Sequence, residues 1–227
     1  YAVLTGQYCW RTTLKKGVLN AASPPLINLE RMTVGDLLQQ EGYYTGHVGK
    51  WHLGHTWHLK DSSSKVEVDN IDWSKPKKIG ALQQGFDYSY GLAKPGWTFS
   101  ENDKALVVPS EKFDLGRDSA YLMGGNNYKG YRAPGYEHEH MLPRFAEKGV
   151  EFIKRAAKGD KPFFMYTHVM LPHTPFIFDA QGSEIKRVDT YATDSNLIEY
   201  KDAYIEQVKF ANKFTIDIVD SIQQKDP

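Results

Sequence analysis

Residues 33–54 have the sequence TVGDLLQQEGYYTGHVGKWHLG, which predicts a short helix, a strand and a polar loop in succession. The helix is expected to begin at Thr33, because this capping residue is followed three positions on by Asp36, and to end at Gly42. Its apolar stripe is formed by Val34, Leu37 and Leu38. A brief extended segment over 44–48 then leads into the polar loop, as is typical of a strand.

The rest of the chain repeats this order of elements. A second helix is expected over 140–159, a buried strand over 163–169 and a long amphipathic helix over about 197–224. This alternation predicts an α/β fold in which a mostly parallel sheet is flanked by helices. Ligands of such sheets bind in the loops beyond the carboxyl ends of the strands, which here are GKWHLG (49–54) and LPHTPF (171–176).

The composition is that of a globular protein. The 227 residues include 28 Lys and Arg against 28 Asp and Glu, so no basic excess exists for a nucleic acid, and no nucleic-acid partner is expected. Aromatic residues make up 13% and the mean hydropathy is −0.55, which suits neither a disordered chain nor a membrane bundle. No window approaches the roughly 18 apolar residues of a membrane span, so no membrane segment is expected.

The stretch over 55–137 is rich in Gly, Pro, Ser, Asn and Asp and has little periodicity. It is expected to be a loop-rich insertion with short elements, kept ordered by its aromatic residues. Trp57, Trp97 and Tyr131 could line a sugar or aryl pocket, although scattered loop aromatics also serve to pin the loop itself.

Two basic groups follow the first predicted strand. Lys50 and His52 are two residues apart, so in extended geometry they point the same way, about 6.6–7 Å apart along the backbone. An ammonium and an imidazole in this arrangement suit an anion. His173 lies in a proline-flanked loop, which could hold an acid–base group still. Solvated loops and structural histidines show the same patterns, so spacing alone leaves both interpretations open.

A family resemblance decides between these interpretations. Residues 42–54 (GYYTGHVGKWHLG) closely resemble the second signature of the type I sulfatases, in the alkaline-phosphatase-like superfamily. Residues 1–8 (YAVLTGQY) are similar to the tail of the first sulfatase signature, and the order and separation of the two matches agree. Residues 85–87 and 172–175 are similar to further elements of the family. The resemblance therefore extends over most of the chain.

The resemblance implies roles for three residues. Lys50 would bind the sulfate and the oxygen of a formylglycine nucleophile, and His52 would contact the formylglycine hydroxyl and help expel sulfate. His173 would bind a sulfate oxygen and support departure of the leaving group. The formylglycine, made from a Cys or Ser, is expected just upstream of Tyr1. Cys9 follows the Thr-Gly of the signature, so it does not match the nucleophile position.

The family also uses one divalent cation, usually calcium. The resemblance places its ligands outside this chain, so no metal ligand is expected within it. Because the chain opens at Tyr1 without an initiator Met, residues 1–227 are expected to be the central part of an N-terminal catalytic α/β domain, incomplete at both ends and inactive alone. The family's periplasmic, extracellular or lysosomal settings make export an expectation, whereas the compartment and the oligomeric state cannot be read from the sequence.

The predicted function of the intact protein is hydrolysis of an aryl or carbohydrate sulfate ester. One alternative is a phosphate or phosphonate ester hydrolase of the same superfamily, and another is a non-catalytic carbohydrate-binding module that uses the aromatic loops. The other histidines are given structural interpretations. His55 and His58 could join His52 in a metal site but lack acidic neighbours, 137–140 (EHEH) reads as a charged helix start, and the strand histidines are expected to be structural. Those strand histidines are His47 and His168.

Overall fold

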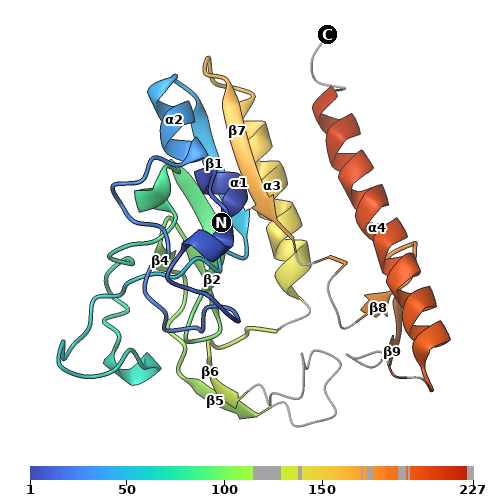
Figure 1. The fold of residues 1–227 in the computed structure, drawn as a ribbon, viewed down its shortest axis with the longest axis horizontal. Coiled ribbons are helices and arrows are strands. Elements are labelled where there is room, and N and C mark those ends of the chain that lie inside the picture. Colours follow the sequence, from blue (N-terminus) through green and yellow to red (C-terminus); the bar gives the residue numbers. More distant parts are fainter. Residues whose placement is uncertain are drawn as a thin grey trace. The chain divides into compact units, whose positions relative to one another are not determined.

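The computed structural model (Figure 1) describes most of the chain. The described residues are 1–114, 129–137, 140–169, 171–172, 176–188, 193 and 195–223. The chain divides into two compact units. The first unit comprises 1–112 and 130–169, and the second comprises 113–129 and 170–227.

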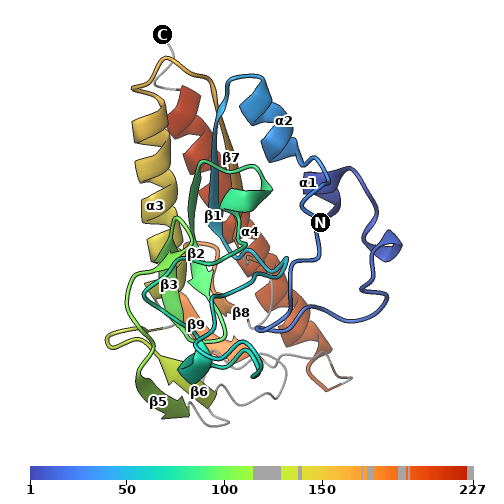
Figure 2. The same cartoon turned by 90° about the vertical axis from the view of Figure 1, so that its left-hand side faces the viewer.

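A five-stranded mixed sheet forms the centre of the first unit (Figures 1 and 2). Its strands lie in the order β4-β3-β2-β1-β7, with bounds Lys104–Ala105, Thr98–Glu101, Tyr88–Ala93, Tyr44–Gly49 and Phe163–His168. Strands β2, β1 and β7 are parallel, whereas β3 and β4 are antiparallel additions. The predicted α/β fold is therefore confirmed, and the parallel part of the sheet is the part that carries the candidate site.

Helix α3 (Met141–Ala156) covers one face of this sheet. Its buried Phe152 stacks on Tyr44 of β1 and on Tyr88 of β2, with ring centroids 5.1 and 5.7 Å apart. A Cβ at Gly46 would collide with the Phe152 ring, so the glycine lets α3 approach the strand closely. The helix expected over 140–159 and the strand expected over 163–169 are both present, but β7, at the end of the strand order, is half-buried rather than buried as predicted.

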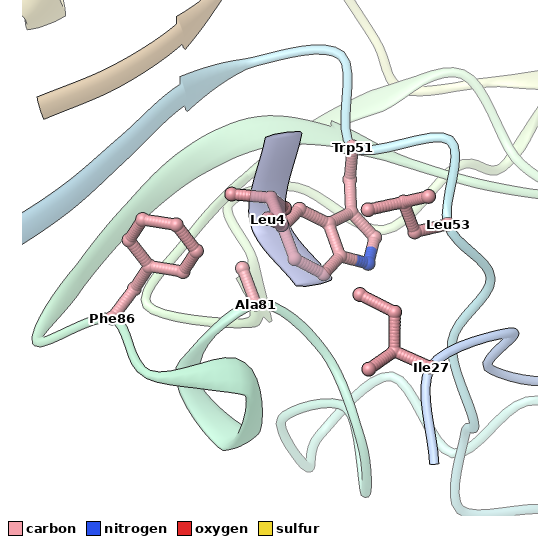
Figure 3. Close-up of a cluster of buried hydrophobic side chains, with 6 residues drawn as sticks. All are labelled: Leu4, Ile27, Trp51, Leu53, Ala81 and Phe86. Carbon is pink, nitrogen blue, oxygen red and sulfur yellow. The ribbon is translucent and has the colours of Figure 1, made fainter. Parts of the chain in front are cut away.

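The opposite face carries α1 (Ala2–Thr5), α2 (Val34–Gln40) and a cluster of buried side chains. Figure 3 shows this cluster, which consists of Leu4, Ile27, Trp51, Leu53, Ala81 and Phe86. Trp51 and Leu53 come from the loop after β1, and Phe86 directly precedes β2. Burial of Trp51 and Leu53 in this cluster therefore anchors the GKWHLG loop.

Helix α2 begins as its sequence predicts. The Thr33 hydroxyl accepts a hydrogen bond from the Asp36 N–H at 3.1 Å, and the Asp36 carboxylate accepts one from the Thr33 N–H at 2.8 Å, which completes a capping box. The predicted apolar stripe is wrong at Leu37, whose side chain is 46% exposed. The buried residue of this helix is Gly35, where a Cβ would collide with the Gly85 main chain.

The stretch over 55–137 contributes directly to the sheet. It supplies β2, β3 and β4, where the sequence predicts loops and short elements. It also contains the 3₁₀ turns Val68–Asn70 and Leu82–Gln84 and a two-stranded sheet of β5 (Glu111–Asp114) and β6 (Lys129–Arg132). Its own core contains Trp57, Ile71, Trp73 and Ala93.

The second unit contains β8 (Phe176–Phe178), β9 (Glu184–Val188) and α4 (Leu197–Gln223). The two strands form an antiparallel hairpin, and α4 packs on it through Ala203 and the rings of Tyr200 and Tyr204 around Phe176. The long terminal helix is thus as predicted. None of the described helices combines the length and the apolar character that crossing a membrane requires.

Candidate active site

The carboxyl ends of the three parallel strands bring basic groups to one edge of the sheet. Lys50 follows β1, His168 ends β7 and Lys94 follows β2. The Lys50 N–H donates to the His168 carbonyl at 3.1 Å, and the His168 ring Nδ1–H donates to the Lys50 carbonyl at 2.7 Å. Gly49 permits this approach, because its φ of 115° suits glycine and a Cβ there would collide with the His168 main chain.

Lys50 is half-buried, and burial lowers the pKa of its ammonium from the ordinary value. No described carboxylate lies within ion-pair distance of it. Because a partly desolvated ammonium without a carboxylate partner gains more from an incoming anion than a solvated one does, this lysine is suited to bind one.

His52 is exposed and has a left-handed backbone, with φ 45°. The strand ends at Gly49, so the extended geometry expected from Lys50 to His52 is not kept. The His52 ring Nε2–H donates to the Leu19 carbonyl at 2.9 Å. Partial burial lowers the pKa of His52, as do the charges of Lys50 and His168, while the Leu19 carbonyl opposes this shift. The two predicted residues therefore lie within electrostatic reach of each other.

His173, the third predicted residue, lies outside the described residues, as do His138 and Glu139 of the EHEH stretch. The structure instead adds His168, for which the sequence favours a structural role. This half-buried ring has a pKa lowered mainly by burial and also by the charge of Lys50, against the Lys50 carbonyl, which raises it. The sequence signal that could have identified His168 is its place at the end of a predicted strand that leads into the LPHTPF loop.

Lys94 and His55 are two further residues that the sequence did not single out for this site. The His55 Nε2–H donates to the Lys94 carbonyl at 2.7 Å, and the Trp57 indole N–H donates to the same oxygen at 2.8 Å. Burial, aided by the charge of Lys77, lowers the pKa of His55 to about 4. His52 and His55 have separate contacts, since His52 bonds to Leu19 and His55 bonds to Lys94.

The three aromatic residues considered for a sugar or aryl pocket have different surroundings. Trp57 is only 3% exposed, packs on Trp73 and joins its loop to the end of β2, so its role is to pin the loop. Tyr131 donates its hydroxyl to the Asp69 carboxylate at 3.2 Å. Trp97 is half-buried, and the Lys94 ammonium lies over its ring.

His47 has the structural role that the sequence predicts. It is fully enclosed in β1 among the rings of Trp51, Phe86 and Tyr166, and its Nδ1 lies 3.1 Å from the Ser89 hydroxyl. Burial, together with the positive charges of Lys77 and His168, lowers the pKa of His47 to about 3. The ring is therefore neutral in the folded protein throughout the physiological range of pH.

This neutral histidine predicts a pH dependence of stability. An unfolded histidine has its ordinary pKa of about 6.5, so the unfolded chain binds a proton as the pH falls through that value while folded His47 does not. Its contribution is complete above about pH 6.5 and is lost toward pH 3, at about 1.4 kcal/mol per pH unit. Denaturant unfolding measures the free energy of unfolding at pH 7 and at pH 5. The decrease in this free energy between the two pH values should be smaller for His47→Gln than for the unsubstituted protein. Equal losses would contradict this prediction.

The chain resembles known proteins over its whole length. The family model described as "Sulfatase" matches residues 1–227, the whole of the chain. The chain belongs to the sulfatase family. The sulfatase fold expected from the signatures over 1–8 and 42–54 is thereby confirmed.

Individual sulfatases show how far the likeness extends. Arylsulfatase G of Rattus norvegicus is 25% identical over 228 residues, which cover 88% of this chain and 37% of the rat protein. The N-acetylgalactosamine-6-O-sulfatase of Bacteroides thetaiotaomicron is 43% identical over 54 residues, 24% of this chain and 10% of that protein. A solved structure described under glycosaminoglycan metabolism by the same bacterium has a TM-score of 0.63 at 20% identity, over 98% of this chain and 48% of its own.

The chain thus spans less than half the length of the rat sulfatase. The sulfatase resemblance implies a calcium ion. The described residues contain no group of three or more His, Cys, Asp or Glu side chains that could hold a metal ion. Calcium prefers several oxygen ligands, whereas the described edge around Lys50 presents nitrogen donors, so it does not fit the ion.

Proposed function

We propose that the intact protein containing this chain hydrolyses a sulfate ester of an aryl or sugar alcohol, and that residues 1–227 form the central part of its catalytic α/β domain. The observation that carries the proposal is the edge formed by β1 and β7, where Lys50 and His168 are held against each other and no described carboxylate pairs with the lysine. Membership of the sulfatase family supports the reaction class.

Lys50 supplies the charge that such a reaction needs. Cleavage of a sulfate ester spreads negative charge over the sulfuryl oxygens and the leaving oxygen, and a fixed cation in a partly desolvated site stabilises that charge. Lys50 is fixed because its main chain is bonded to β7 on one side and its neighbour Trp51 is buried on the other. We therefore assign it to the sulfuryl group.

His52 is suited to move a proton. Its Nε2–H is committed to the Leu19 carbonyl, so in the neutral ring the lone pair is on Nδ1. The lowered pKa favours that neutral form near pH 7. His52 can therefore accept a proton from a hydroxyl at the reaction centre, which agrees with the role that the family resemblance implies. His168 has the opposite arrangement, because its Nδ1–H is committed to Lys50 and its lone pair is on Nε2.

The nucleophile implied by the resemblance, a formylglycine preceding Tyr1, would adjoin this edge. Tyr1 packs against the buried cluster that contains Trp51, the neighbour of Lys50, which supports the placement. Calcium, also implied by the resemblance, enters no step proposed for this chain's residues.

The experiment that tests the proposal is an assay of the intact protein on 4-nitrophenyl sulfate and on 4-nitrophenyl phosphate. Turnover of the sulfate supports the proposal. Turnover of the phosphate alone would move the protein to the phosphate ester hydrolases, and saccharide binding without turnover of either ester would favour a binding module. A sulfated monosaccharide in the same assay separates aryl from sugar preference.

Two histidine variants test the assigned roles in the same assay. His52→Ala and His173→Ala are each expected to lower kcat by about 10²-fold or more, because each removes a proton-transfer or charge-stabilising group. His140→Ala, at an exposed histidine before α3, is the matched control and should keep the unsubstituted rate. Full activity of either site variant would remove that residue from the catalytic assignment.

A further inference from the structure

Lys94 lies at the same edge of the sheet as Lys50, although the proposed reaction does not use it. Gly91 of β2 is in register with Gly49 of β1, the two strands lie about 4.8 Å apart, and β2 continues past the end of β1 to Ala93. Lys50 is the first residue beyond β1, and Lys94 is the first beyond β2.

The position of Lys94 is fixed at both ends of the residue. Its carbonyl accepts hydrogen bonds from the rings of His55 and Trp57, at 2.7 and 2.8 Å. Its ammonium lies over the Trp97 ring, where a cation is attracted to the face of the indole. Because Trp57 is itself buried against Trp73, the main chain of Lys94 is held by a packed aromatic pair.

The electrostatics of Lys94 favour an anion. Burial lowers the pKa of Lys94 well below its ordinary value, and the charge of Lys50 lowers it further. No described carboxylate lies within ion-pair distance of either lysine. Two neighbouring ammonium groups repel each other, and an anion bound at Lys94 would remove that penalty.

The charge of the substrate indicates what that anion is. A sulfate monoester carries one negative charge, which Lys50 alone can offset. We propose that Lys94 is a specificity-determining residue that binds a second anionic group, a carboxylate or a second sulfate, on a saccharide whose ester sulfate is bound at Lys50. This inference rests on the proposed function and deepens it by naming a doubly charged saccharide as the substrate class.

Kinetics on a matched set of saccharides test the inference in the intact protein. The set consists of a monosulfated N-acetylhexosamine, the same sugar linked to a uronic acid, and its disulfated form. Lys94→Met is expected to raise KM for at least one doubly charged saccharide about tenfold more than for the singly charged one, because it removes one charge-assisted contact. Lys94→Arg should restore most of the difference, and Lys65→Met, at an exposed lysine, should leave every KM unchanged.

The doubly charged saccharide whose KM rises more identifies the second anionic group as a carboxylate or a sulfate. An equal loss on all three saccharides would overturn the inference and place Lys94 on the ester sulfate, and no loss on any would make it a structural residue. Calorimetric Kd values for the same saccharides separate this result from failure of the proposed function. If no ester is hydrolysed, the calorimetric Kd values still decide. The inference is overturned if Lys94→Met leaves the Kd for the doubly charged saccharides unchanged, or if these saccharides do not bind at all.

Discussion

Replacing Lys50 with Ala is expected to lower kcat/KM for sulfate ester hydrolysis by the intact protein by about 10²–10³-fold, the usual effect of removing one preorganised charge-stabilising donor. Lys50 is half-buried and has no described carboxylate partner, so no other contact would retain its function once the ammonium is gone. Steady-state kinetics on 4-nitrophenyl sulfate measure the effect.

Two further variants define the cause of this loss. Lys50→Arg keeps the charge but replaces a compact ammonium with a planar fork, so an intermediate rate is expected. Lys65→Ala removes an exposed lysine of the 55–137 stretch and should leave the rate unchanged. Activity of Lys50→Ala within a factor of a few of the unsubstituted protein would exclude Lys50 from binding the sulfuryl group.

Replacing Asp103 with Ala is expected to lower the free energy of unfolding by about 3–5 kcal/mol, because it leaves a buried ammonium without its partner. Lys77 lies 3.4 Å from the Asp103 carboxylate, and the two side chains are only 5% and 1% exposed. The same carboxylate accepts a hydrogen bond from the Leu82 N–H at 3.1 Å. Burial lowers the pKa of Lys77, and the Asp103 carboxylate opposes that shift.

Denaturant unfolding of the single and double variants checks this prediction. Lys77→Met together with Asp103→Ala should recover part of the loss, since neither charge then remains unpaired in the core. Asp160→Ala, at an exposed carboxylate, is the matched control. A change below about 1 kcal/mol for Asp103→Ala, the range of surface pairs, would show that water reaches Lys77 in solution.

Local signals in the sequence predicted α2 and β1 correctly. The Thr33 and Asp36 capping box is made within four residues of chain, so it can be read without knowledge of the fold. Strand β2 was not predicted, because the contacts that determine where it begins are made by residues far away in the sequence. The Thr45 N–H donates to the Asp87 carboxylate at 2.8 Å, and Gly46 is in register with Tyr88, so residues 42 positions apart determine where this strand begins.

The residues of the candidate site also differ in whether the sequence could predict them. Lys50 and His52 could be found because a family signature contains them. Lys94 belongs to no motif, and its position depends on side-chain donors from His55 and Trp57, 39 and 37 residues away. His168 was assigned a structural role because its contact with Lys50 arises only from the β1–β7 pairing.

The reciprocal hydrogen bonds between Lys50 and His168 also bear on protein synthesis. The two residues are 118 positions apart, so the contact requires closure of a long loop that local structure cannot supply. On the ribosome, the GKWHLG segment must therefore wait, without its partner strand, until β7 has been translated and has left the exit tunnel. During that interval the edge of β1 that later pairs with β7 is open to pairing with other chains, which makes it a point of aggregation risk in the nascent polypeptide.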